Sequence, residues 1–83
     1  MNRDNVLFHL QEAAEELNRT VAEFEQNPQF SEPELLVAMQ HLYHHLNTAW
    51  NSRAVDAGRL ERATDQDFNR WSAYPADLPV MEV

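Results

Sequence analysis

An apolar repeat near the start of the chain constrains its fold more than any other feature. The spacing between apolar residues alternates there between three and four, the pattern of a helix with one apolar seam. The residues of this repeat are Leu7, Leu10, Ala14, Leu17, Val21 and Phe24. Asp4 can act as the N-cap and Pro28 cannot continue a helix, so the pattern predicts a helix from about Asp4 to Gln26. Its length of about three heptads favours a helix of a bundle over a coiled coil.

The segment that follows carries the clearest helix-start signal. Ser31 and Glu34 have the spacing of a capping box, and Pro33 is tolerated in the first helical turn. The helix is expected to continue to about Arg53. Its apolar stripe covers an arc wider than about 100°. A single neighbouring helix would not cover the whole of this stripe. The stripe consists of Leu35, Leu36, Met39, Leu42, Tyr43, Leu46, Ala49 and Trp50.

The last part of the chain predicts a short third helix. Thr64 is a suitable N-cap, and Phe68 and Trp71 share a face three residues apart, which suits docking on the long helices. Tyr74-Pro75 marks the end of this helix. A weaker helical turn is expected from Asp56 to Arg62.

Together these segments predict an all-α fold, an antiparallel hairpin of two long helices with a short third helix docked on it. Residues 1–75 are expected to form one domain and residues 76–83 an extended or frayed tail. A chain of 83 residues buries only roughly 60% of the surface that it exposes when unfolded. The wide stripe of the second helix then lacks cover, so we expect a homodimer that forms a four-helix bundle.

Charge is distributed unevenly along the chain. There are fourteen acidic and six basic residues, a net charge of −8, which argues against binding nucleic acid through its phosphates. Residues 35–55 carry no acid and only Arg53, so the polar face of the second helix is uncharged at neutral pH. Such a face loses its water at lower cost than one of carboxylates, which predicts contact with another chain or a ligand. The alternative is chance in a short segment.

Several side chains of the second helix, together with Trp71, are candidates for a protein interface. Histidines line the uncharged face, and large aromatic side chains often anchor interfaces. The candidates are His41, Tyr43, His44, His45, Trp50 and Trp71. For the two tryptophans the alternative is packing inside the chain's own core.

Two of the histidines also have the spacing of a metal chelate. His41 and His45 lie one helical turn apart on the same side, where they could bind a divalent metal. A third ligand would have to come from His9, a glutamate of the first helix or another subunit. The alternative is that the histidines edge a helix interface and form hydrogen bonds across it. No other cofactor is expected.

Catalysis finds little support in the sequence. Cysteine and lysine are absent, and the serines Ser31, Ser52 and Ser72 lie in no glycine-rich turn. Acid–base chemistry by a histidine is an alternative without a supporting motif. We therefore expect a protein that is not an enzyme. The longest apolar run, Leu35 to Met39, is too short for the roughly 20 residues of a membrane span, and a cytoplasmic location is expected.

The function predicted from these features is that of a small acidic protein that associates with itself or with another protein. The alternatives are a divalent-metal-binding protein and an acidic inhibitor of a basic partner. Acid pH would stabilise histidines that face carboxylates in the assembled state and destabilise histidines that are buried without such partners.

Overall fold

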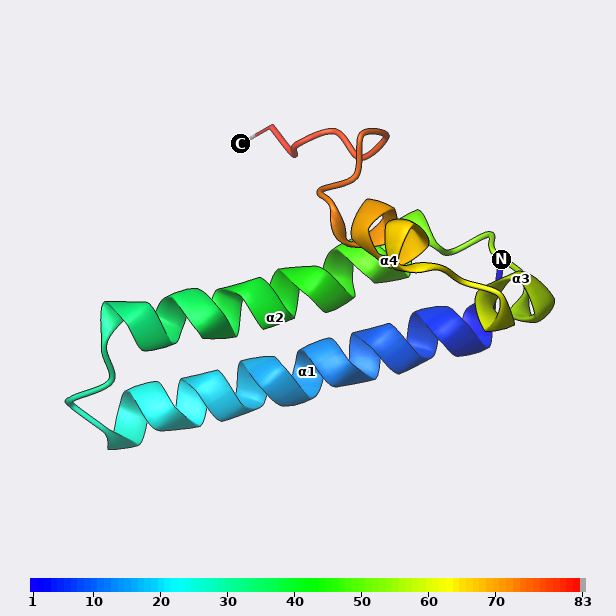
Figure 1. The fold of residues 1–83 in the computed structure, drawn as a ribbon. Coiled ribbons are helices and arrows are strands. Elements are labelled where there is room, and N and C mark those ends of the chain that lie inside the picture. Colours follow the sequence, from blue (N-terminus) through cyan, green and yellow to red (C-terminus); the bar gives the residue numbers. More distant parts are fainter. Residues whose placement is uncertain (83) are drawn as a thin grey trace.

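The computed structural model describes residues 1–82, and four helices lie within this range. The long helices α1 (Arg3–Gln26) and α2 (Glu32–Asn51) form an antiparallel hairpin, followed by the short helices α3 (Ala57–Glu61) and α4 (Asp65–Ser72), as Figure 1 shows. No strand occurs among the described residues. The predicted all-α class and the pairing of two long helices are confirmed. The molecule measures 45 × 31 × 22 Å.

The N-terminus of α1 is capped by Asn2 and not, as predicted, by Asp4. The Asn2 side-chain oxygen accepts the backbone N–H of Asn5 at 3.2 Å. The Asn2 backbone N–H donates to the carbonyl of Arg53 at 2.6 Å, and its side-chain amide donates to that of Val55 at 2.9 Å. The residues after α2 therefore fix the start of α1, a long-range effect that local cap preferences do not contain.

The hairpin turn forms at the residues that predicted it. The backbone N–H and the hydroxyl of Ser31 both donate to Glu34 Oε1, at 3.3 and 2.9 Å. Phe30 packs edge-on against Phe24, with ring centroids 5.3 Å apart, and closes the turn. At its other end α2 stops at Asn51, short of the predicted Arg53.

The short helices are joined by one buried carboxylate. Asp67 accepts the backbone N–H of Thr64, its N-cap partner, at 3.0 Å. It also pairs with Arg59 of α3 at 2.7 Å and with Arg70 of α4 at 2.8 Å. The hydrogen bonds from Thr64 and Arg59 lower the pKa of Asp67 from its ordinary 3.8 to about 2. The turn predicted for residues 56–62 is therefore a helix, α3, fastened to α4.

Two amides of α2 hold α4 in place. Asn47 donates its side-chain N–H to the carbonyl of Ser72 at 2.9 Å. Asn51 donates to the carbonyls of Trp71 and Ala73, both at 2.7 Å. These contacts supply partners for carbonyls at the C-terminus of α4, which the helix itself leaves unpaired. Trp71 is buried beneath this junction.

Residues 73–82, after α4, contain no helix and are anchored to α2. Asp77 accepts the indole N–H of Trp50 at 2.8 Å and pairs with Arg53 at 2.9 Å. The Arg53 guanidinium also lies 3.9 Å from the centroid of the Trp50 ring. Of the predicted tail, Val83 lies outside the described residues. None of the described helices is long and apolar enough to cross a membrane.

Candidate interaction surface

The apolar repeat of α1 is exposed to solvent. Leu7 and Phe24, near its two ends, are 53% and 57% exposed, and Leu10, Leu17 and Val21 are exposed to a similar degree. A repeat that packed against α2 would be largely buried. The structure thus turns the apolar seam of α1 away from the helix beside it.

Three pairs of polar side chains mark the contact between α1 and the segment of α2. The Asn5 amide donates to the hydroxyl of Ser52 at 2.9 Å. Further along the hairpin, the Nδ1 atoms of His9 and His45 lie 3.1 Å apart. Near the middle of α1, Glu16 Oε1 is 3.9 Å from Nδ1 of His41. This polar contact line places the apolar stripes of both helices to one side of it.

Both apolar stripes lie on the same side of the hairpin. At about 100° per residue, the centre of each stripe lies about 90° around its helix from the contact line. The rotation has the same direction in both helices, and because the helices are antiparallel, both stripes then lie on the same side of the hairpin. Val6 and Leu10 of α1 and Leu46 and Trp50 of α2 accordingly line one hollow of about 280 Å³. We call this surface the apolar side. It comprises Val6, Leu7, Leu10, Ala14, Leu17, Val21, Phe24, Leu35, Leu36, Met39, Leu42, Tyr43, Leu46 and Trp50.

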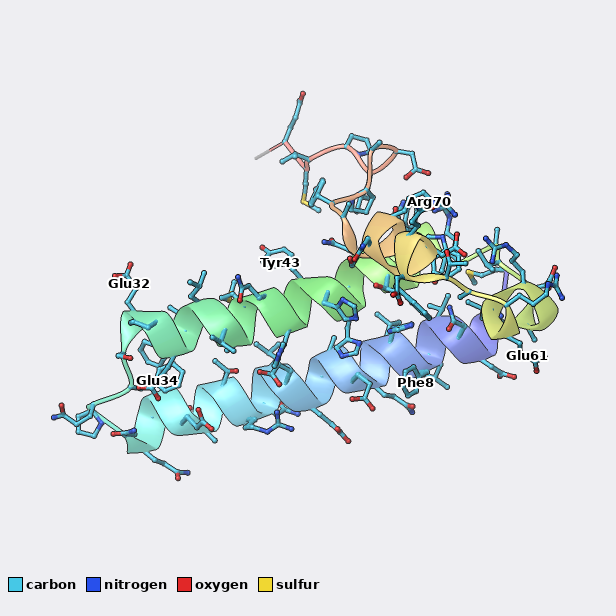
Figure 2. The ribbon with its side chains drawn as sticks, in the orientation of Figure 1. Phe8, Glu32, Glu34, Tyr43, Glu61 and Arg70 are labelled. Carbon is cyan, nitrogen blue, oxygen red and sulfur yellow. The ribbon has the colours of Figure 1, made fainter. Side chains whose placement is uncertain are left out.

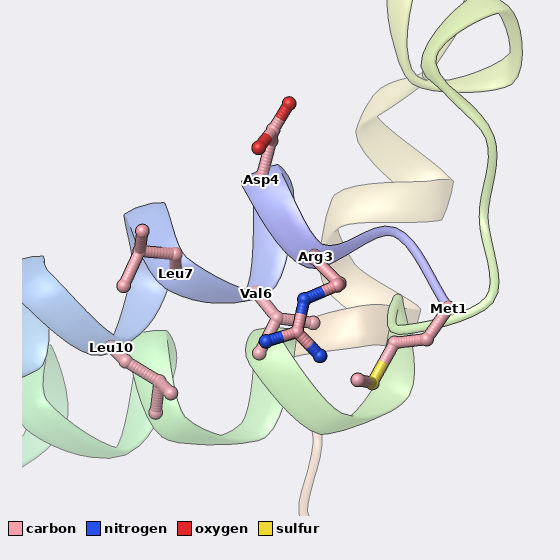
Figure 3. Close-up of a pocket in the computed structure, with 6 residues that line it drawn as sticks. All are labelled: Met1, Arg3, Asp4, Val6, Leu7 and Leu10. Atoms are coloured by element: carbon pink, nitrogen blue, oxygen red, sulfur yellow. The ribbon is translucent and has the colours of Figure 1, made fainter.

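A second hollow, of about 370 Å³, extends the apolar side at the start of α1. Figure 3 shows its lining, with Val6, Leu7 and Leu10 beside the side chains of Met1 and Arg3. Arg3 lies at the end of the apolar stripe, and its aliphatic stem adjoins leucine and valine. The apolar side is therefore continuous from this end of the hairpin along α1.

The chain has a thin core and a large surface. The buried apolar residues among positions 1–82 are Ala13, Ala49, Trp71 and Pro75. The accessible surface is 6476 Å², whereas a compact monomer of 9.7 kDa exposes about 5,100 Å². The excess of about 1,400 Å² exceeds the roughly 800 Å² that each partner contributes to a standard protein interface.

The face of the hairpin opposite the apolar side carries charged side chains among apolar ones such as Val37. Arg19 pairs with Glu16 at 2.7 Å, and both line an open hollow of about 480 Å³ together with His41. Figure 2 shows Phe8 and Tyr43 pointing away from the contact between α1 and α2. The hairpin thus has one apolar side and an opposite side on which charged and apolar side chains are mixed.

The predicted interface residues do not gather on one surface. Tyr43 and Trp50 belong to the apolar side, whereas His41 borders the hollow on the opposite side. His45 lies between the two long helices, opposite His9. His44 is exposed, with its ring against that of His45. Trp71 is only 5% exposed and packs inside the chain.

The uncharged face of α2 is largely used within the chain. Asn47 and Asn51 bind α4, Ser52 accepts the Asn5 amide, and the hydroxyl of Thr48 donates to the carbonyl of His44 at 2.6 Å. Asn47, Thr48 and Ser52 are buried. Charged side chains at these positions would lose their hydration without a compensating partner. Contacts with α4 and α1 therefore explain why this part of the face, from Asn47 to Ser52, carries no charged side chain.

Two histidines of α2 are each paired with a residue of α1. His45 pairs with His9, and His41 with Glu16, so His41 and His45 have different neighbours on α1. Burial, and then the charges of His45 and His44, lower the pKa of His9. Burial is also the main cause that lowers the pKa of His45. Within residues 1–82 no group of three or more histidines, cysteines or carboxylates is placed to hold a metal ion.

Sequence reasoning missed Asn2 and Asn5 as contact residues of α1, whereas His9 and a glutamate of this helix were named as candidate metal ligands. Asn2, Asn5, His9 and Glu16 recur at helical spacing, and each meets a residue of α2 or of the loop that follows α2. This polar stripe runs beside the apolar repeat, and its spacing is visible in the sequence. The apolar repeat of α1 lies on the neighbouring face of the helix. Comparisons of the chain with protein-family models, curated proteins and solved structures found no match.

Proposed function

We propose that this protein is a self-associating helical module, a homodimer whose two apolar sides pack face to face as a four-helix bundle. The observation that carries this proposal is the exposure, on one side of the hairpin, of the apolar stripe of α1 and of Leu36, Met39, Tyr43 and Leu46 of α2. Burial of such a surface contributes roughly 25 cal/mol per Å². Dimerisation would supply the core that Ala13, Ala49 and Trp71 alone do not provide.

A second copy of the chain suits the shape of the apolar side. The surface is a layer of two antiparallel helices, and a second such layer covers it with the packing of ordinary helical bundles. Its interior contains aliphatic and aromatic side chains and no ionised group. A twofold interface uses the same surface on both subunits, so one apolar side per chain is sufficient.

The proposed role is binding and not catalysis. The hollows of the described surface are lined by apolar side chains on one face, and by Glu16, Arg19 and His41 among others on the opposite face. We place the dimer in the cytoplasm. That compartment suits a chain without cysteine, because secreted chains of this size commonly depend on disulfides. The side of the hairpin opposite the apolar side remains free in the dimer for a protein partner.

Sedimentation equilibrium from low to high micromolar concentration tests the proposal. The wild-type chain should sediment at twice its mass of 9.7 kDa. Leu17→Glu should shift the protein toward monomer, because the carboxylate would be desolvated in the interface. Phe8→Glu is the matched control, since Phe8 is about as exposed as Leu17 but lies outside the apolar side.

Two outcomes would contradict self-association through the apolar side. The first is a wild-type chain that keeps its monomer mass at high micromolar concentration. The second is equal loss of the dimer in Leu17→Glu and Phe8→Glu. Circular dichroism of each variant shows whether its helices remain folded, which separates dissociation from unfolding.

A further inference from the structure

The ends of the apolar side carry opposite charges. Arg3 lies at the end where α1 begins, beside Val6, whereas the neighbouring Asp4 lines the same hollow but points away from Arg3 and Val6 (Figure 3). Glu25, near the C-terminus of α1, and Glu32, the first residue of α2, lie at the other end, next to the turn of the hairpin. Arg3, Glu25 and Glu32 are all exposed, and none of them forms an ion pair among the described residues.

Two hairpins can stack face to face in two ways. If both turns lie at the same end of the bundle, like charges meet. Two copies of Arg3 then share one end, and two copies each of Glu25 and Glu32 share the other. If the turns lie at opposite ends, each arginine faces the acidic end of the other subunit. Complementary charges select between such arrangements because juxtaposed like charges are unfavourable.

We propose, building on the self-association above, that the second copy binds with its turn at the opposite end of the bundle. Arg3 then faces Glu25 of the partner subunit, and the twofold axis passes close to Ala14. In this arrangement α1 packs against α1 of the partner, and α2 against α2 of the partner. Arg53 contributes less to this polarity because it already pairs with Asp77 at 2.9 Å.

Three residues of the apolar repeat of α1 have the symmetry that this arrangement requires. Ala14 lies midway between Arg3 and Glu25 in the sequence, and also midway between Leu7 and Val21. When two copies of α1 cross antiparallel at Ala14, Leu7 of one meets Val21 of the other. The small side chain of Ala14 leaves room for close approach at the axis.

The apolar residues of α2 are symmetric in the same way. The centre lies between Leu42 and Tyr43, with Met39 and Leu46 at equal distances on either side. Leu35 and Trp50 form the next symmetric pair. An antiparallel crossing of two α2 helices at this centre therefore brings apolar side chains opposite apolar side chains.

The hairpin places both centres at the same level. His9 lies opposite His45, and Glu16 lies opposite His41. Ala14 falls between His9 and Glu16, and Leu42 falls between His41 and His45, so the two positions share one level of the hairpin. One twofold axis can therefore serve both helices. In the same-end arrangement the two copies of α1 would instead lie diagonally across the bundle.

A single cysteine tests the arrangement, because the natural chain has none. Ala14→Cys should form a covalent dimer under mild oxidation at concentrations at which the wild-type chain is dimeric. Across the diagonal of a bundle the Cα atoms would lie beyond the roughly 7 Å that a disulfide spans. Glu15→Cys is the matched control, since the adjacent exposed position points away from the apolar side and should stay reduced.

Charge reversal provides an independent measurement. Arg3→Glu and Glu25→Arg should each raise the dimer dissociation constant, by roughly 2- to 30-fold for two symmetric exposed pairs. The double variant should recover most of the wild-type affinity. Lack of an Ala14→Cys crosslink in a protein that still sediments as a dimer would overturn the opposite-end arrangement alone. A wild-type chain that is monomeric throughout would overturn the dimer itself.

Discussion

The Nδ1 atoms of His9 and His45 lie 3.1 Å apart across the contact between α1 and α2. A hydrogen bond between two imidazole nitrogens needs one protonated and one unprotonated nitrogen. The half-buried pair therefore accommodates a neutral state better than a doubly charged one. Of the two opposite pH responses that the sequence permitted, this relationship predicts the loss of stability in acid.

Acidification should destabilise the protein. Burial and then the charges of His45 and His44 lower the pKa of His9. Burial with the charges of His44 and His41 lowers the pKa of His45 against the opposing carboxylates of Glu12 and Glu16. Below pH 6.5, the ordinary pKa of histidine, the unfolded chain binds more protons at these histidines than the folded chain does. The melting temperature should be constant above this pH and fall as pH drops through the lowered folded values.

Differential scanning calorimetry at fixed protein concentration and at several pH values measures this response. His9→Gln should flatten it, because the glutamine amide does not titrate. His41→Gln should leave most of it in place, since His41 faces Glu16 and lowers the pKa of His45 less than burial and His44 do. A melting temperature that rises as pH falls from neutral to 5.5 would contradict the prediction.

Trp71→Ala should release α4 from α2. The indole is 5% exposed and is the largest apolar side chain buried in the described chain, and truncation of such a residue costs roughly 3–5 kcal/mol. Near-ultraviolet circular dichroism should lose intensity while the far-ultraviolet signal of the long helices persists. Tyr74→Ala, at a position that is 56% exposed, is the control and should change stability little.

Asn51→Ala should weaken the same junction through lost hydrogen bonds. The Asn51 amide donates to Trp71 and Ala73 at 2.7 Å, and loss of it leaves carbonyls of the α4 terminus without partners. We expect a decrease of roughly 1–3 kcal/mol in the free energy of unfolding. Urea denaturation measures it, with Asn18→Ala at an exposed position of α1 as the control. Equal stability of the two variants would contradict the role of Asn51.

Asp67→Asn should separate α3 from α4. The carboxylate binds Arg59 and Arg70, and its pKa is lowered to about 2, so its contribution is present above the ordinary value of 3.8 and is lost as pH falls toward 2. The neutral amide of asparagine cannot form an ion pair with either arginine. Proteolysis within residues 54–64 should become faster in this variant. Asp65→Asn, an exposed change in the same helical turn, should leave the rate unchanged.

Helix positions could be predicted from the sequence because helix formation depends on neighbouring residues. The capping box at Ser31 and Glu34, the cap at Thr64 and the break at Pro28 each act over a few residues. The predicted hairpin and the helical turn at residues 56–62 followed from these local signals. The cap of α1 failed as a prediction because Asn2 is held by the carbonyls of Arg53 and Val55, remote in sequence.

The candidate surface could be predicted only in part. The apolar residues of α1 and α2 were identified, and so was the shortage of cover for α2. The uncharged face of α2 was interpreted as an interface, whereas Asn47 and Asn51 use much of it to bind α4. A sequence shows that a face tolerates desolvation but does not show whether the partner lies in the same chain or in another.

The sequence by itself determined the two long helices, their antiparallel connection and an apolar stripe on each. The tertiary structure decided how each helix is rotated about its axis. Pairing of His9 with His45 and of Asn5 with Ser52 turned the polar stripe of α1 toward α2 and left the apolar repeat outside. Periodicity fixes which residues share a face, because it follows from backbone geometry. The direction of that face depends on side chains that meet only after the chain has folded.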